Sequence, residues 1–198
     1  MADHDAADCA PIPSVVIRPP DPASTPQIRA LLRHCRGVDL GFGALIDAPT
    51  ERLLDVIVES QSRAYQGRYP GSGYQVIEVD AEPRGVLFLD RGRAADRVVD
   101  IVILPEHRGR GIGTAALRHV LSEAAAAGRP VHLSVRHGNP ALRLYERLGF
   151  LPVDPSAFDI EMTWIADGSP STEAKASPPS TPSDQRSLAS ETDEVNKG

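Results

Sequence analysis

The sequence predicts an α/β domain of the α+β type, in which a mixed, mostly antiparallel central sheet is flanked by helices. Between residues 15 and 166, short β-branched runs alternate with stretches whose apolar residues recur at helical spacing. One pair of strands is joined by a short turn, and another pair is separated by a helix. Antiparallel and parallel neighbours are therefore expected in one sheet.

The N-terminal half of this domain is predicted to hold a strand, two helices and a hairpin. The strand at 14–19, "SVVIRP", ends at a proline, and residues 24–35 then show helical spacing. Residues 49–66 form a second amphipathic stripe, with Thr50 as a candidate cap. The period changes at 73–91, where a turn containing proline and glycine joins two strands.

The C-terminal half continues the alternation of strands and helices. Its predicted elements are a strand at 96–106, a helix from 113 that ends before Gly128, a strand at 131–135, a short helix between the cap Asn139 and Gly149, and a strand at 158–166. The first of these strands is almost continuously apolar, as expected for a strand that is covered on both faces.

The two ends of the chain differ in composition from this domain. Residues 1–14 and 167–198 are poor in large apolar residues and are expected to be disordered tails. Each carries a net charge of −3 out of the total of −6, which leaves residues 15–166 near neutrality. A neutral domain argues against nucleic-acid binding.

The absence of a long apolar run, a disulfide framework and metal-ligand spacing favours a cytoplasmic protein that neither enters a membrane nor binds a metal.

A glycine-rich turn, "GRGIG" at 109–113, separates the strand at 96–106 from the next helix. The first turn of a helix presents unpaired N–H groups and the positive end of the helix dipole, and glycines let an anion approach the backbone. The turn is therefore predicted to cradle a phosphate, with Arg108 and Arg110 adding charge. Because Thr114 follows the last glycine and no lysine is present, the spacing disfavours Rossmann and P-loop nucleotide-binding proteins.

Two motifs together resemble the GCN5-related N-acetyltransferase (GNAT) superfamily. Residues 108–113, "RGRGIG", are similar to the family's Arg/Gln-x-x-Gly-x-Gly/Ala signature, with Arg108, Gly111 and Gly113 at the motif positions. Further along, "NPALRLYERLGF" at 139–150 resembles the second motif. The pair is far more specific than either motif alone.

The resemblance implies an enzyme that uses acetyl-CoA. It places the pyrophosphate on the glycine-rich turn and the pantetheine arm along the backbone of the preceding strand. It places the thioester where that strand and the one at 131–135 splay apart. The residues it assigns to the cofactor are Ile101, Val102, Ile103, Arg108, Gly109, Arg110, Gly111, Ile112, Gly113, Thr114 and Asn139. It assigns Tyr145 to protonating the departing thiolate. A tyrosine is protonated at neutral pH, but its helical spacing equally fits a core side chain.

The general base is less clear from the sequence. Many family members carry a glutamate on a central strand, and Ser134 stands where one is expected. Asp100 interrupts an apolar strand, which is unusual without a partner or a role, and it is the leading candidate. Glu78 and His137 are alternatives, as is base action through water. An ion pair with an arginine would also explain Asp100.

The sequence therefore predicts an N-acetyltransferase that transfers the acetyl group directly to a primary amine in a ternary complex. Cys9 lies in a tail and Cys35 on an early helix, so neither suggests a covalent intermediate. The alternative is a non-catalytic acyl-CoA-binding module of the same fold. The acceptor, a small molecule or a protein amine, stays open, and the protein is expected to be a monomer or a homodimer.

Overall fold

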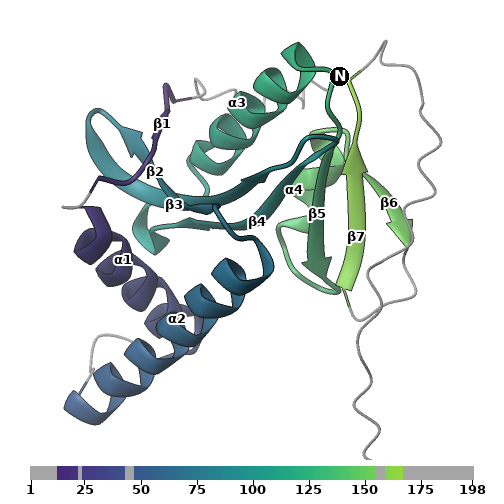
Figure 1. The fold of residues 1–198 in the computed structure, drawn as a ribbon. Helices are drawn as coiled ribbons and strands as arrows, with labels where there is room; N and C mark the ends of the chain where they lie inside the picture. The colour runs from purple at the N-terminus through teal and green to yellow at the C-terminus, as the bar shows by residue number, and fades with distance from the viewer. Residues whose placement is uncertain (1–12, 22–23, 43–46, 155–158, 167–198) are drawn as a thin grey trace, which may run out of the picture.

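The computed structural model describes residues 13–21, 24–42, 47–154 and 159–166. These residues form one seven-stranded sheet of order β1-β2-β3-β4-β5-β7-β6, flanked by helices (Figure 1). The strands are β1 (Val16–Arg18), β2 (Gly73–Val79), β3 (Glu82–Arg91), β4 (Asp96–Ile103), β5 (Val131–Arg136), β6 (Leu151–Asp154) and β7 (Asp159–Trp164). Apart from Pro13 and Ser14, the tails expected to be disordered lie outside the described residues.

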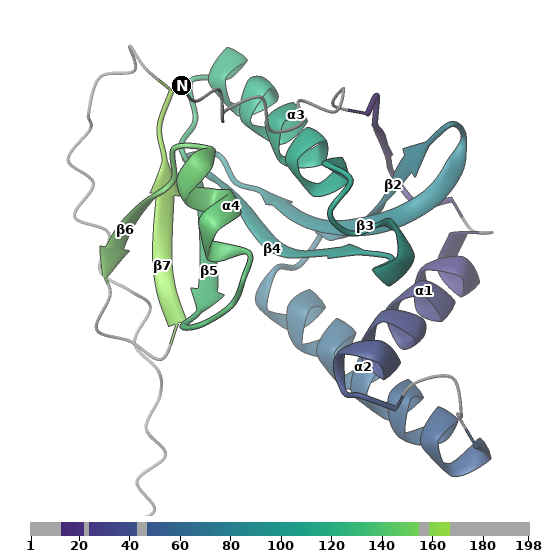
Figure 2. The ribbon, with the colours of Figure 1, turned by 180° about the vertical axis from the view of Figure 1, so that it is seen from behind.

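The helices form two layers, one on each face of the sheet (Figures 1 and 2). They are α1 (Ser24–Asp39), α2 (Ala48–Arg68), α3 (Ile112–Ala126) and α4 (Leu142–Arg147). One apolar core lies between the sheet and α3 with α4, and a second lies between the sheet and α1 with α2. Among the described helices, none is both long and apolar enough to cross a membrane.

The strands β4 and β5 form a wedge in the middle of the sheet. They are the one parallel pair among the described strands, and their register stops at Val98 opposite Leu133. A β-bulge lies in β4 at the same point. Phe88 of β3 pairs with Asp100, while the next residue of β3 pairs with Val98. Val99 is the extra residue. The strands therefore separate beyond Val98, as the resemblance implied.

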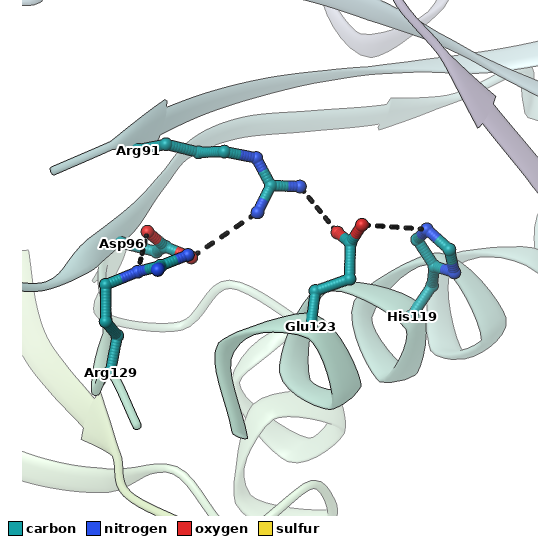
Figure 3. A network of polar contacts seen from close by, with 5 residues as sticks. All are labelled: Arg91, Asp96, His119, Glu123 and Arg129. Atoms are coloured by element: carbon teal, nitrogen blue, oxygen red, sulfur yellow. Dashed lines mark hydrogen bonds and ion pairs between the residues drawn. The ribbon is translucent and has the colours of Figure 1, made fainter. Parts of the chain in front are cut away.

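An ion-pair network holds the closed end of this wedge (Figure 3). The carboxylate of Asp96, at the start of β4, is fully buried. Arg129, just before β5, donates to it from Nε at 2.9 Å and from Nη2 at 3.1 Å, and Arg91 of β3 lies 3.5 Å away. Arg91 also reaches Glu123 on α3 at 2.5 Å. The network joins β3, β4, α3 and the start of β5.

The predicted fold class is confirmed, with three local differences. The short strand β6 (Leu151–Asp154) was not predicted, since it is only four residues long and Pro152 inside it hides the β pattern. The hairpin turns at Asp80 and Ala81, whose φ angles are 53° and 61°, and the predicted proline and glycine fall inside β3. The cap of α2 is Asp47, which accepts from the backbone N–H of Thr50 at 3.0 Å.

Candidate active site

The glycine-rich turn leads directly into the first turn of α3. Gly109 and Gly111 have φ angles of 74° and 78°, in the left-handed region that favours glycine. Gly111 is the N-cap of α3 and supplies no side chain to satisfy the first N–H groups of the helix. The backbone N–H groups at Ile112, Gly113 and Thr114 therefore have no side-chain cap from Gly111, and the anion site predicted there stays a prediction.

Gly113 differs from the other two motif glycines. A Cβ atom at this position would lie 3.8 Å from the side chains of Ile103 and Leu144, which is ordinary van der Waals contact. At Gly111, by contrast, any side chain would strain the backbone because φ is positive. The fold itself thus accepts a side chain at Gly113, so a requirement for glycine there would come from the ligand.

Arg108 stabilises the glycine-rich turn through hydrogen bonds, and it adds little net charge to the turn. Its Nη1 atom lies 2.7 Å from Asp39 Oδ1 at the end of α1, and its Nε donates to the carbonyl of Ile103 at 3.0 Å. Arg108 thus ties α1 and β4 to the glycine-rich turn, and its charge is offset by Asp39. Arg110 lies exposed in the turn itself.

The backbone of β4 beyond the bulge has an edge that β5 does not cover. The Ile103 carbonyl faces away from β3 and is already bonded to Arg108, whereas the next N–H, that of Leu104, donates to Arg84 of β3. Because successive residues of a strand alternate in direction, Ile101 faces the open edge and Val102 faces β3. Of the three strand residues assigned to the pantetheine arm, Ile101 therefore faces the open edge, although its N–H also donates to the Asp100 carboxylate.

Asp100 lies at the mouth of the wedge, on the face covered by α1 and α2. Its Oδ2 atom is 3.2 Å from Gln61 Nε2, 3.3 Å from the Tyr74 hydroxyl and 3.6 Å from Arg36 Nη2. Burial raises the pKa of Asp100, and Arg36 is the strongest of the groups that oppose the rise. Asp100 is thus ion-paired with an arginine, as one alternative held, and it lies directly beyond the last paired residues of β4 and β5.

Tyr145 approaches the same wedge from the other face of the sheet. Its ring is 7% exposed and stacks edge-on against Phe150, with the ring centroids 5.9 Å apart. Burial raises the pKa of Tyr145 to about 12, and the negative charge of Asp100 is the second cause. The tyrosine therefore serves as a core side chain and also lies within electrostatic reach of Asp100.

Asn139 is the last residue that the resemblance assigned to the cofactor. Its Oδ1 atom accepts from the backbone N–H of Ala141 at 2.9 Å, one residue before α4 begins. The oxygen thus shapes the turn that leads into α4. The residue is exposed, so its amide nitrogen can still donate to a ligand.

A carboxylate that sequence reasoning missed lies beside Ser134. Glu161 of β7 pairs in register with Ser134 of β5 and accepts its hydroxyl, on the same face as Asp100. Arg97 Nη2 lies 2.9 Å from both carboxylate oxygens of Glu161. The alternating pattern of the last strand is enough to place Glu161 outside the core. The sequence does not show which residue of the neighbouring strand pairs with Glu161. Because Arg97 engages both oxygens, Glu161 is a weaker base candidate than Asp100.

The other two base candidates lie elsewhere. Glu78 of β2 pairs with Arg18 of β1 at 2.6 Å, which places it at the far side of the sheet from β5. His137 follows β5 in an exposed turn. The structure thus places Asp100 within electrostatic reach of Tyr145, on opposite faces of the sheet, whereas Glu78 lies at the far side of the sheet.

Comparison with known proteins agrees with this geometry. The family model described as the acetyltransferase (GNAT) family matches residues 44–150. The PaiA N-acetyltransferase from Thermoplasma acidophilum, in complex with coenzyme A, has a TM-score of 0.58 at 14% identity, over 77% of this chain and 99% of that one. An acetyltransferase from Thermus thermophilus gives 0.57 at 18% identity, over 78% and 99%. A histone acetyltransferase HPA2 and related acetyltransferase from Corynebacterium glutamicum gives 0.53 at 24% identity, over 76% and 93%.

At these identities the solved structures establish the fold, while the family model rests on the sequence itself. Its match spans more than half of the chain and includes β4, the glycine-rich turn and α4. These elements include one strand of the wedge and the turn before α3, and by this match the chain belongs to the acetyltransferase (GNAT) family.

Proposed function

We propose that the protein is an N-acetyltransferase that uses acetyl-CoA and acts on a primary amine by direct attack in a ternary complex. The observation that carries this proposal is the convergence of Asp100 and Tyr145 on the wedge between β4 and β5. Family membership supports acyl transfer, and one structural neighbour is a complex with coenzyme A. The uncapped first turn of α3 fits the pyrophosphate of coenzyme A, and the open edge at Ile101 fits its pantetheine arm.

Each side chain has one task in this reaction. Acetyl-CoA supplies a thioester as the acetyl donor. Asp100 takes the proton of the acceptor amine, so that the nitrogen can form the new bond to the acetyl carbon as the carbon–sulfur bond breaks. The Tyr145 hydroxyl donates to the departing sulfur, and its raised pKa keeps it protonated throughout the neutral range.

The described cysteine favours direct transfer over an acetyl-cysteine intermediate. Cys35 is fully buried in α1, and burial raises the pKa of its thiol to about 11. The thiolate is the nucleophilic form of cysteine, so this thiol is inert at neutral pH.

Replacing Tyr145 with phenylalanine tests the acid. We expect kcat to fall at least about 10-fold, because the leaving sulfur loses its donor. The ring packing against Phe150 stays, so we expect acetyl-CoA affinity and melting temperature close to those of the parent protein. Release of free coenzyme A across a panel of primary amines measures kcat, and calorimetry measures affinity. An unchanged rate would remove Tyr145 from this role.

Replacing Gly113 with alanine tests the anion cradle. We expect acetyl-CoA to bind about 10-fold more weakly, because a Cβ keeps the pyrophosphate away from the backbone. We also expect no loss of stability, since alanine favours a helix over glycine by about 1 kcal/mol. Gly67→Ala in α2, where a Cβ meets nothing within 4 Å, is the matched control and should leave affinity unchanged.

Two results would contradict the proposed function itself. If the parent protein does not bind acetyl-CoA at tens of micromolar, the donor is wrong. If it binds acetyl-CoA but releases no coenzyme A with any amine, the non-catalytic acyl-CoA-binding module is the better description.

A further inference from the structure

A polar cluster joins the last turn of α1 to the Asp100 carboxylate. Arg36 Nη2 lies 3.6 Å from Asp100 Oδ2, and the two side chains are 28% and 16% exposed. The same Nη2 atom donates to Gln61 Oε1 at 2.9 Å. Arg36 therefore acts on Asp100 both directly and through a side chain of α2.

The contact with Arg36 determines which end of the Gln61 amide points toward Asp100. With Oε1 held by Arg36, Nε2 donates to Asp100 Oδ2 at 3.2 Å and to the Tyr65 hydroxyl at 2.7 Å. An amide has one acceptor oxygen and one donor nitrogen, so the reversed amide would bring its oxygen against the carboxylate. Arg36 thus keeps a hydrogen-bond donor pointed at Oδ2.

We propose that Arg36 is a positioning residue that keeps Asp100 ionised near neutral pH and holds its Oδ2 atom in place. The catalytic meaning of this role rests on the proposed function, in which Asp100 is the base. The electrostatic role itself is a property of the protein alone and can be measured without any acceptor.

The groups around Asp100 explain why one guanidinium matters so much. A carboxylate taken out of water favours its neutral form unless an opposite charge lies close by. The polar and titratable groups that face Asp100 are Arg36 from α1, Gln61 and Tyr65 from α2, Tyr74 from β2, Tyr145 from α4 and the backbone N–H of Ile101 in β4. Among these groups, Arg36 alone carries a positive charge. The tyrosines are neutral across the neutral range, because burial raises their pKa values.

The direct test is a titration of Asp100 by carbon-13 NMR in protein labelled at the aspartate carboxyl, with Asp100→Asn used to assign the signal. We expect Arg36→Met to raise the pKa of Asp100 by about one unit or more. We expect Arg36→Lys to keep most of the parent value, since it retains the charge. If Arg36→Met fails to fold, Arg36→Gln removes the same charge and is read in the same way.

A matched control separates charge from helix packing. Arg33, one turn earlier in α1, pairs with Asp55 of α2 at 3.3 Å and has no bond to Asp100. We expect Arg33→Met to leave the Asp100 titration unchanged. No shift in Arg36→Met, or an equal shift in Arg33→Met, would overturn the proposal.

Kinetics then separate this inference from the proposed function. If Asp100 is the base, the acidic limb of kcat/KM moves upward in Arg36→Met by the amount seen in the NMR titration. An NMR shift with no acidic limb in the parent enzyme would remove the base role of Asp100 while the electrostatic role of Arg36 stands. An acidic limb that vanishes in Asp100→Asn but does not move in Arg36→Met would leave the base intact and overturn the role of Arg36.

Discussion

Replacing Asp100 with asparagine is expected to lower kcat/KM about 100- to 10,000-fold, the range typical of a general base. The amide keeps the size of the side chain and can still bond to Gln61 and Tyr74, so the loss would reflect the missing base. Coenzyme A release under subsaturating amine measures kcat/KM. We expect acetyl-CoA affinity to change little.

The pH dependence of this variant follows from the environment of Asp100. Burial raises the pKa of Asp100, so if Asp100 is the base we expect kcat/KM of the parent protein to fall as the pH drops through that raised value and Asp100 becomes protonated. In Asp100→Asn this acidic limb should be absent. Ionisation of Tyr145, whose pKa is raised to about 12, contributes no basic limb below about pH 10.

Stability provides an independent readout of the same substitution. The folded-state pKa of Asp100 lies above the unfolded value, so the folded protein binds this proton more tightly, and that contribution to stability is lost as the pH rises. Above that raised pKa the buried ionised carboxylate therefore costs stability. We expect the melting temperature of Asp100→Asn to equal or exceed that of the parent. A lower melting temperature together with normal turnover would identify Asp100 as a structural ion pair.

Glu161→Gln is the matched control for the base. Glu161 lies on the same face but has both oxygens bonded to Arg97. We expect a much smaller loss of kcat/KM than in Asp100→Asn. If the two variants exchange these phenotypes, Glu161 is the base and Asp100 is not.

Replacing Asp96 with asparagine is expected to lower the free energy of unfolding by about 2–3 kcal/mol. Removing one partner of a buried ion pair leaves the other charge uncompensated, and the cost is reduced here because the Arg129 side chain is 25% exposed. The substitution acts at the closed end of the wedge, where Asp96 links β4 to the start of β5 (Figure 3). Urea denaturation followed by circular dichroism measures the change.

Glu123→Gln tests the exposed side of the same network. The Arg91 and Glu123 side chains are 38% and 43% exposed, so their ion pair is expected to contribute less than about 1 kcal/mol. A loss in Glu123→Gln as large as that in Asp96→Asn would mean that burial is not what gives Asp96 its effect. An unchanged free energy of unfolding in Asp96→Asn would contradict the prediction outright.

The local patterns that the sequence predicted correctly are those that depend on neighbouring residues. The helical spacing of residues 24–35, the helix predicted from 113 to before Gly128 and the β pattern of 131–135 correspond to α1, α3 and β5. The glycine-rich turn also has the backbone expected of it, because only a residue without Cβ adopts the φ angles of Gly109 and Gly111 readily. The turn at Asp80 and Ala81 was missed because it uses residues that rarely adopt positive φ.

The site depended on contacts between residues far apart in the chain. Arg36 and Gln61 showed no signal in the sequence, since each is a polar residue on an amphipathic helix whose position relative to β4 was unknown. Glu161 was hidden for the same reason. The β-bulge at Val99 could not be read from a continuous apolar run either, although it places Asp100 on the face of the sheet that α1 and α2 cover.

The sequence alone determined the fold class, the glycine backbone of the turn before α3 and the motif residues, because periodicity, capping and the conformational freedom of glycine act over a few residues. Only the tertiary structure decided what Asp100 and Arg108 contact. A carboxylate or a guanidinium takes its role from the charges and the burial around it, and those come from α1, α2 and α4, which the chain brings to β4 only by folding.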